Sequence, residues 1–421
     1  MTTTAARTVR LGARDYPVIL PSLRDSRLHL AAVIISIHVL GQTSFGFRVS
    51  VPQILSAILT CAVIEVGWTF YHDRKIVWPA SAMLTGSGVA LILRLVSMPR
   101  GDHWSWHGWE LFALVAGFSL ASKYVIRWRG SHVFNPSNFG LVVAFLILGS
   151  SVIEPLDFWW APIGPWLVMA YLLILAGGLM ITSRLRLLAM GAVFWLTLSA
   201  GLGLLSASGH CITAAWSLQP VCGLDFWWVV VTSPEVLIFL FFMITDPKTI
   251  PSGWWARVAF ALVLGAVCTF LIAPAANEFW AKVGLLGGLV ALTPFRHLFD
   301  NMFPDGAGER VPTPLGRLLD GARRSVFLRG AVVGSVFVLA GAALVAAGSP
   351  ARNGGSTVAP SVVSTPAQIG VEVDAASLPA VTVDTEARGL NGDVADDPGA
   401  LALALAQDLA VEGEAMRKLD P

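Results

Sequence analysis

Two short motifs broken by proline carry the side chains best suited to bind a ligand. The first is SHVFNPSNFG at 131–140, where Asn135 directly precedes Pro136. Proline lacks a backbone N–H and disfavours helix in the residue before it, so a capped helix is expected to begin there. Its N–H groups and positive dipole end would suit a phosphate or a flavin carbonyl, while a plain capped helix start explains the same residues. The candidate ligand-binding residues of this motif are Asn135, Pro136, Ser137, Asn138 and Gly140.

The second motif is ITDPKTIPSG at 244–253, in which Asp246, Lys248 and Thr249 lie between two prolines. The prolines prevent the preceding helix from continuing. Lys248 and Thr249 are candidates to bind an anionic group. Alternatively, Asp246 pairs with Lys248 and simply ends the helix, which is the simpler interpretation of this motif alone.

Both motifs are expected at the same membrane face, near two stretches rich in small or polar residues at 79–88 and 293–301. Interrupted helices at membrane depth are tolerated where they line a cavity. We therefore predict that Asn135 and Asp246 line one cavity that opens to the cytoplasm.

Three ionisable residues, His38, Glu65 and Glu235, fall inside apolar stretches. Charge at membrane depth is costly, and such residues usually face a bundle interior or a transport pathway. Glu235 follows Pro234, which predicts a kinked helix. The sequence makes Glu65 and Glu235 candidates for a proton or ion pathway, and neutral hydrogen-bonded core residues are the alternative.

The composition predicts that lipid is the solvent for the elements that position these residues. The chain has 421 residues, of which 55% are hydrophobic and 13% charged, with a mean hydropathy of +0.69. A soluble domain has about 25% charged residues. The net charge of +1 argues against a nucleic-acid partner. Four cysteines without a CxxC or Cys/His cluster predict no metal site.

An all-α integral membrane protein is the predicted fold class, because a spanning helix needs about 20 mostly apolar residues. Most basic residues fall on one side when the N-terminus is placed inside, as the positive-inside rule requires. The predicted spans are 29–47, 51–71, 76–98, 108–126, 133–152, 166–182, 187–206, 226–245, 256–274, 280–296 and 326–348.

The ends of the chain differ in composition from the predicted core at 29–303. Residues 1–28 form a basic segment that is expected to stay in the cytoplasm, and 304–325 form a basic cytoplasmic linker. An eleventh helix at 326–348 is expected to carry the acidic tail, 349–421, to the outside. That tail is rich in small residues and has few aromatics, which predicts mostly disordered chain.

The outer loop between the seventh and eighth predicted spans contains Cys211 and Cys222. An oxidising compartment permits a disulfide between them, and two unpaired thiols are the alternative.

The two motifs together resemble those of the RnfD/NqrB family, the membrane subunits D of Rnf complexes and B of the sodium-translocating NADH:quinone oxidoreductase. The resemblance rests on Ser122-Lys123, the HVFNPSNFG run and the FMITDPKT run at 242–249. The residues of both runs resemble still more closely those of the UnbU branch, found beside enediyne biosynthesis genes. The resemblance covers roughly residues 25–303.

The resemblance implies a ten-helix core in two five-helix halves of inverted topology, in a bacterial cytoplasmic membrane. It also implies electron transfer through flavin, coupled to ion movement. Members attach FMN to the Thr of a Ser-Gly-Ala-Thr motif in an outer loop. The corresponding loop here, 149–165, has no Thr, which argues against covalent attachment. A noncovalent FMN, riboflavin or quinone is the ligand that the resemblance then implies.

The leading hypothesis is a membrane electron-transfer subunit that serves enediyne-type specialised metabolism. Its expected partners are membrane lipid, other subunits of a redox complex or a soluble biosynthetic enzyme. A transporter on the same scaffold without a cofactor is the main alternative, favoured by Glu65, Glu235 and the missing Thr. A third hypothesis is a membrane scaffold whose acidic tail docks a soluble enzyme.

Overall fold

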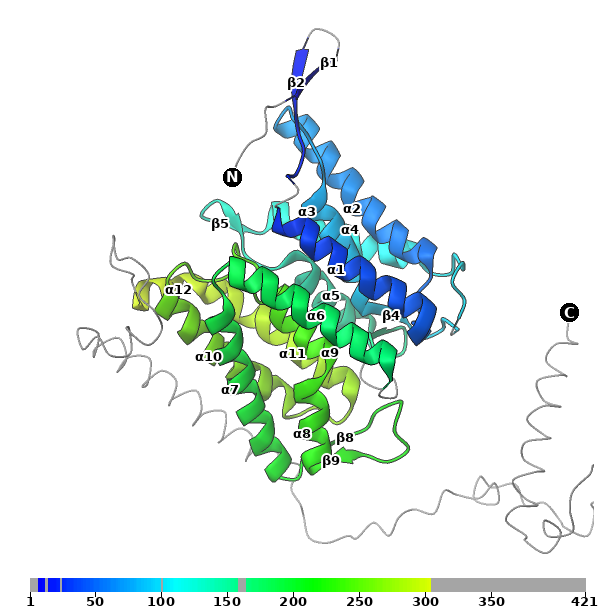
Figure 1. Ribbon diagram of the computed structural model, residues 1–421, viewed down its shortest axis with the longest axis vertical. Helices are drawn as coiled ribbons and strands as arrows, with labels where there is room; N and C mark the ends of the chain where they lie inside the picture. The colour runs from blue at the N-terminus through cyan, green and yellow to red at the C-terminus, as the bar shows by residue number, and fades with distance from the viewer. Residues whose placement is uncertain (1–6, 12–13, 23–24, 100, 158–163, 304–421) are drawn as a thin grey trace, which may run out of the picture. The chain divides into compact units, whose positions relative to one another are not determined.

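The computed structural model describes residues 7–11, 14–22, 25–99, 101–157 and 164–303. Helices dominate this part of the chain (Figure 1). Among the described residues, six helical stretches are long and apolar enough to cross a membrane: Ser26–Phe45, Val51–His72, Pro165–Arg184, Leu188–Ala207, Gly223–Met243 and Trp254–Ile272. A multi-pass membrane protein follows from them. The predicted linker, eleventh helix and acidic tail lie outside the described residues.

Each of the ten apolar stretches predicted within 29–296 contains helix, but two helices are much shorter than expected. Helix α3 (Ala80–Ile92) and helix α5 (Pro136–Leu148) have 13 residues each. At 1.5 Å per residue each is about 20 Å long, which falls short of a hydrocarbon core of about 30 Å. The predicted full-length helices at 76–98 and 133–152 are therefore corrected to short ones. A proline stands at the start of each helix; strand follows α3 directly, and a turn that begins at Gly149 follows α5.

The extended chain after the two short helices forms a buried pair of strands. Strand β4 (Leu93–Leu95) follows α3 and pairs antiparallel with β7 (Ile153–Pro155), which follows α5. Backbone polar groups at membrane depth need partners within the protein, and the pairing supplies them. The two short helices are thus joined at their C-terminal ends.

The stretch predicted as one kinked span at 226–245 is broken into three pieces. Helix α8 (Gly223–Thr232) ends before Pro234, and α9 (Pro234–Ile238) continues into a π-helical turn, η2 (Phe239–Met243). Ser233 caps α9 by accepting a hydrogen bond from the Val236 N–H at 3.1 Å. The predicted kink at Pro234 is confirmed.

The remaining helices pack in two comparable sets. Helix α2 (Val51–His72) contacts α3 and α4 (Trp109–Val125), and α4 contacts α5. Helix α7 (Leu188–Ala207) contacts α8 and α10 (Trp254–Ile272), and α10 contacts α11 (Glu278–Leu292).

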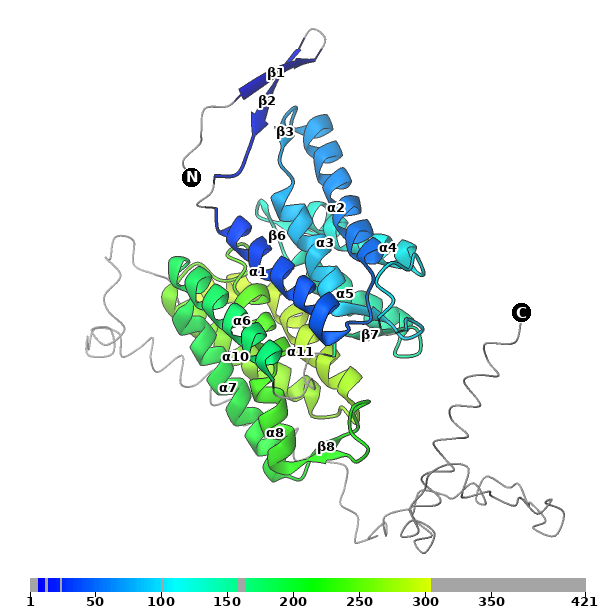
Figure 2. The ribbon, with the colours of Figure 1, turned by 45° about the vertical axis from the view of Figure 1, so that its right-hand side comes forward.

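Helix α1 (Ser26–Leu40), extended by the π-helical turn η1 (Gly41–Phe45), contacts α3 of the first set and lies along α6 (Pro165–Arg184) in both views (Figures 1 and 2). Helix α6 in turn contacts α7 of the second set. Helix α5 of the first set also contacts α11 of the second set directly. The core therefore runs continuously through both sets of helices.

Short strands connect the helices at their ends. An N-terminal hairpin of β1 (Arg7–Leu11) and β2 (Arg14–Ile19) is extended by β3 (Ile76–Val77), which pairs parallel with β2. Strands β5 (Arg127–Trp128) and β6 (Ser131–His132) form a second hairpin just before α5.

The loop between α7 and α8 holds strands β8 (Cys211–Ile212) and β9 (Val221–Cys222), which pair antiparallel. A disulfide joins Cys211 to Cys222 across this pair. The described chain ends with the 3-10 turn η3 (Thr293–Phe295) and helix α12 (Arg296–Met302).

Candidate functional site

A cavity of about 1590 Å³ lies where the N-terminal segment, the first turns of α3 and α5, and the loop after η2 come together. Both proline motifs contribute to its wall, so Asn135 and Asp246 line the same cavity, as the sequence predicts. The motif residues that line it are Asn135, Pro136, Ser137, Asp246 and Lys248.

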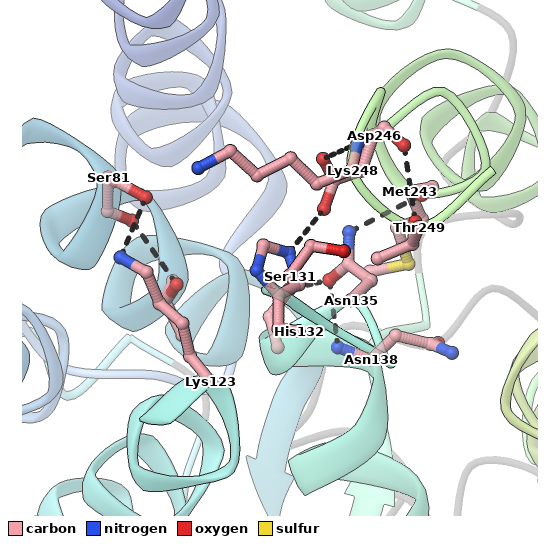
Figure 3. Close-up of polar contacts among 12 residues, drawn as sticks. Ser81, Lys123, Ser131, His132, Asn135, Asn138, Met243, Asp246, Lys248 and Thr249 are labelled. Carbon is pink, nitrogen blue, oxygen red and sulfur yellow. Dashed lines mark hydrogen bonds and ion pairs between the residues drawn. The ribbon is translucent and has the colours of Figure 1, made fainter. Parts of the chain in front are cut away.

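One direct contact joins the two motifs, and a second joins the first motif to Met243, the residue just before the second. The Nε2 atom of His132 lies 3.2 Å from Oδ2 of Asp246. The Asn135 side chain donates from Nδ2 to the Met243 carbonyl at 3.3 Å (Figure 3). His132 is buried and also lines the cavity, although sequence reasoning did not single it out. Its place inside the first motif was the available signal.

Asn135 fixes the start of α5 at the cavity wall. Its Oδ1 accepts hydrogen bonds from the Asn138 N–H at 3.3 Å and the Ser137 hydroxyl at 2.9 Å. Pro136 occupies the first helical position, where a missing N–H costs nothing. An N-cap side chain and an N1 proline define a helix start sharply. The positive end of α5 therefore meets the cavity.

Asp246 organises the loop that follows η2. Its Oδ1 accepts the Lys248 N–H at 3.0 Å, and its carbonyl accepts the Thr249 hydroxyl at 3.2 Å. Burial opposes ionisation of Asp246, but the hydrogen bond and charge of His132, with a smaller contribution from Lys248, hold its pKa below the ordinary value. Asp246 is thus the anionic partner that joins this loop to β6.

The lowered pKa of Asp246 predicts a pH dependence of stability. A carboxylate with a depressed pKa stabilises the fold above its unfolded-state pKa, and that contribution disappears as the pH falls through the folded-state value. Wild-type protein should therefore melt at a higher temperature than Asp246→Asn at neutral pH. The difference should shrink below about pH 4, near the ordinary aspartate pKa. Thermal melts of both proteins in detergent from pH 7 to pH 3 measure it, and a constant difference would contradict the assignment.

A buried ion pair lies at the start of α3. The Lys123 ammonium lies 2.7 Å from Oε1 of Glu65 and donates to the Ser81 hydroxyl at 3.2 Å. The other carboxylate oxygen of Glu65 accepts the Ala82 N–H at 2.9 Å. Glu65, predicted to lie on a proton or ion pathway, therefore neutralises Lys123 and satisfies a free N–H of the first turn of α3. Lys123 and Ser81 line the cavity.

Three residues of the predicted site lie behind the cavity wall. Asn138 donates from Nδ2 to the Leu286 carbonyl at 3.0 Å, which joins α5 to α11. Gly140 lets α4 approach α5, because a Cβ there would collide with Ser119. Thr249 is fully buried in the Asp246 turn. In this structure these residues shape the site, and none of them contributes to the cavity lining.

No protein-family model and no curated protein matches the chain. Among the described residues, no group of three or more His, Cys, Asp or Glu side chains is arranged to hold a metal. The RnfD/NqrB resemblance therefore stays a prediction that rests on the two motifs.

Glu235, the second predicted pathway residue, belongs to a separate buried cluster. Its Oε1 lies 3.9 Å from Nζ of Lys282, whose side chain is 6% exposed. Lys282 also lies 3.4 Å from Asp157 and 3.9 Å from Glu278. Sequence reasoning missed Lys282, although a lysine inside the apolar stretch 280–296 was a visible signal.

Proposed function

We propose that this protein is an electron-transfer subunit of a bacterial cytoplasmic membrane that binds a flavin or quinone noncovalently in the large cavity. The observation that carries the proposal is that both RnfD/NqrB-like motifs line that cavity and contact each other through His132 and Asp246. When bound, a flavin or quinone accepts electrons and passes them on. The residues of the two motifs resemble those of the UnbU branch, and this favours a role in enediyne-type specialised metabolism.

The helix contacts support a ten-helix core of two inverted five-helix halves. The contacts of α2 with α3 and α4 have counterparts in those of α7 with α8 and α10. The contact of α4 with α5 likewise has a counterpart in that of α10 with α11. An odd number of crossings in each half inverts the second half relative to the first.

The cavity is proposed to face the cytoplasm. Its wall includes the N-terminal segment and the loops after α2, α4 and η2, all of which the positive-inside rule places inside. On this topology an eleventh helix at 326–348 would carry the tail outward.

The lining of the cavity fits a flat ring system that carries an anionic group. Trp78, Phe241 and Phe242 supply aromatic surface. Lys75 and Lys248 supply positive charge, and the N-terminal end of α5 supplies the positive end of a helix dipole. Aromatic faces stack on a ring such as isoalloxazine, and cationic side chains suit a phosphate.

Lys248→Met is expected to weaken FMN binding by about tenfold to a hundredfold while leaving riboflavin binding nearly unchanged. The Lys248 side chain extends away from Asp246, is exposed and lines the cavity (Figure 3). A hydrogen bond between charged groups contributes about 1.5–3 kcal/mol, and riboflavin has no phosphate. Titration of the purified protein with each flavin, followed by quenching of flavin fluorescence, measures both affinities.

Arg186→Met is the matched control, because Arg186 is an exposed cation between α6 and α7 that does not line the cavity. It should leave both affinities unchanged. Failure of wild-type protein to bind FMN, riboflavin and a short-chain quinone would reject the redox proposal.

The size of the cavity favours an exporter as the second candidate function. Its volume of about 1590 Å³ exceeds the 300–1,000 Å³ common for small-molecule pockets. Such a cavity could admit a bulky metabolite rather than a cofactor. Deletion of the gene separates the two functions: finished product accumulates inside the cell if the protein is an exporter, and a product with an altered redox state appears if it is an electron-transfer subunit.

A further inference from the structure

A second cavity of about 40 Å³ lies directly beyond the inner wall of the large one. Ile92 of α3, Ile238 of α9 and Met243 of η2 line both cavities. We call these three shared apolar side chains the partition. The small cavity is about the size of two or three water molecules, and its exposed lining is almost entirely apolar.

The small cavity is lined on another side by Glu235 and Lys282. Lys282 donates to the Leu156 carbonyl at 3.0 Å, and its ammonium lies within 4 Å of Glu235, Asp157 and Glu278. Three carboxylates around one buried ammonium give this cluster several proton-accepting groups within short reach of each other. Apolar packing alone would not require any of these charges.

Other polar groups face the cluster from neighbouring elements. Tyr171 of α6 donates its hydroxyl to the Thr232 carbonyl at 2.8 Å. Trp216 donates from Nε1 to Glu278 at 2.9 Å, and the Ala215 N–H donates to the same carboxylate at 3.3 Å. Trp216 lies in the loop between β8 and β9, and Asp157 follows β7. The cluster therefore connects the small cavity to loops predicted on the outer face, opposite the loops that line the large cavity.

The partition is built partly on the least regular helix of the core. Ile238 and Met243 lie on either side of the change from α helix to π helix, just after the break at Pro234. Short π-helical turns inside helices occur frequently at functional sites. A small change in this segment would move two of the three partition side chains.

We propose that protons cross the protein from the large cavity through the partition to Glu235 and Lys282, and leave by Asp157 or Glu278. A proton from cavity water converts the Glu235 carboxylate to the acid. The Lys282 ammonium then gives a proton to the Asp157 or Glu278 carboxylate, and the neutral amine takes the proton of Glu235. One proton enters and one leaves, and no electron moves. This proposal does not depend on flavin binding.

Proteoliposomes that contain a trapped pH-sensitive dye test the route without any flavin. With the membrane potential clamped by potassium and valinomycin, an external acid pulse should acidify wild-type vesicles slowly, because the partition excludes water. Met243→Ala should raise the rate about tenfold, the factor that corresponds to a barrier lowered by about 1.4 kcal/mol. Adding Glu235→Gln to Met243→Ala should return the rate to within about twofold of wild type.

Ile174→Ala is the matched control, because Ile174 is fully buried in α6 and lines neither cavity. It should leave the rate unchanged. If Met243→Ala does not give a monodisperse protein in detergent, Ile92→Ala opens the same partition from α3. A leak that persists after Glu235→Gln overturns the assigned route, and a folded partition variant with no leak overturns the partition itself.

Discussion

Lys123→Met is expected to lower the free energy of unfolding by about 3–5 kcal/mol, because it leaves the Glu65 carboxylate buried without its cation. The two side chains are only 14% and 10% exposed, so water cannot replace the lost partner. The Ala82 N–H would still hold the carboxylate at the start of α3. Denaturant unfolding in detergent micelles, followed by tryptophan fluorescence, measures the change.

Two comparisons show whether that loss comes from a buried unpaired charge. Arg48→Met breaks the ion pair with Glu154, whose side chains are about a quarter exposed, and should cost less than about 1 kcal/mol. The double variant Lys123→Met/Glu65→Gln should be more stable than Lys123→Met alone, since it removes the uncompensated charge. If Lys123→Met lowers the free energy of unfolding no more than Arg48→Met does, the pair of Lys123 with Glu65 is effectively solvated.

The sequence predicts where helices lie because lipid requires long apolar stretches, and these are visible in hydropathy. It also predicts the positions of breaks, since Pro136 and Pro234 act on their own backbone regardless of the fold. The end of α3 was not predictable in this way, because it is set by pairing between β4 and β7, three-residue strands about sixty positions apart. Helix α5 ends at Gly149, whose φ is +71°, and a glycine at that place is a signal the sequence does carry.

The same distinction applies to the candidate site. Asn135 and Asp246 stand out because each shapes a local turn beside a proline. Glu65 and Lys123 are 58 positions apart, and His132 and Asp246 are 114 apart. Which buried charge finds which partner depends on helix packing. For this reason the pairing of Glu65 with Lys123 could not be predicted, and a place for Glu65 on a proton or ion pathway stays a prediction.

Gly86→Ala is expected to destabilise the protein by about 1–3 kcal/mol, although alanine is the better helix former. A Cβ at Gly86 would lie 2.7 Å from the carbonyl carbon of Ala57 and 2.8 Å from Cα of Ile58. These are backbone atoms of α2, so no side-chain rotation can relieve the overlap, and α3 must move away. Small residues that let two helices approach this closely are typical of helix–helix interfaces within membranes.

The displacement of α3 should also reach the cavity, because Ser81 and Thr85 on the same helix line it. We therefore expect Gly86→Ala to weaken flavin binding together with stability. Gly67→Ala is the matched control, since a Cβ at Gly67 on α2 meets no atom within 4 Å. That change should raise stability by up to about 1 kcal/mol through helix propensity and leave binding unaltered. If Gly86→Ala and Gly67→Ala change stability and flavin binding equally, the close contact between α2 and α3 does not exist in the membrane.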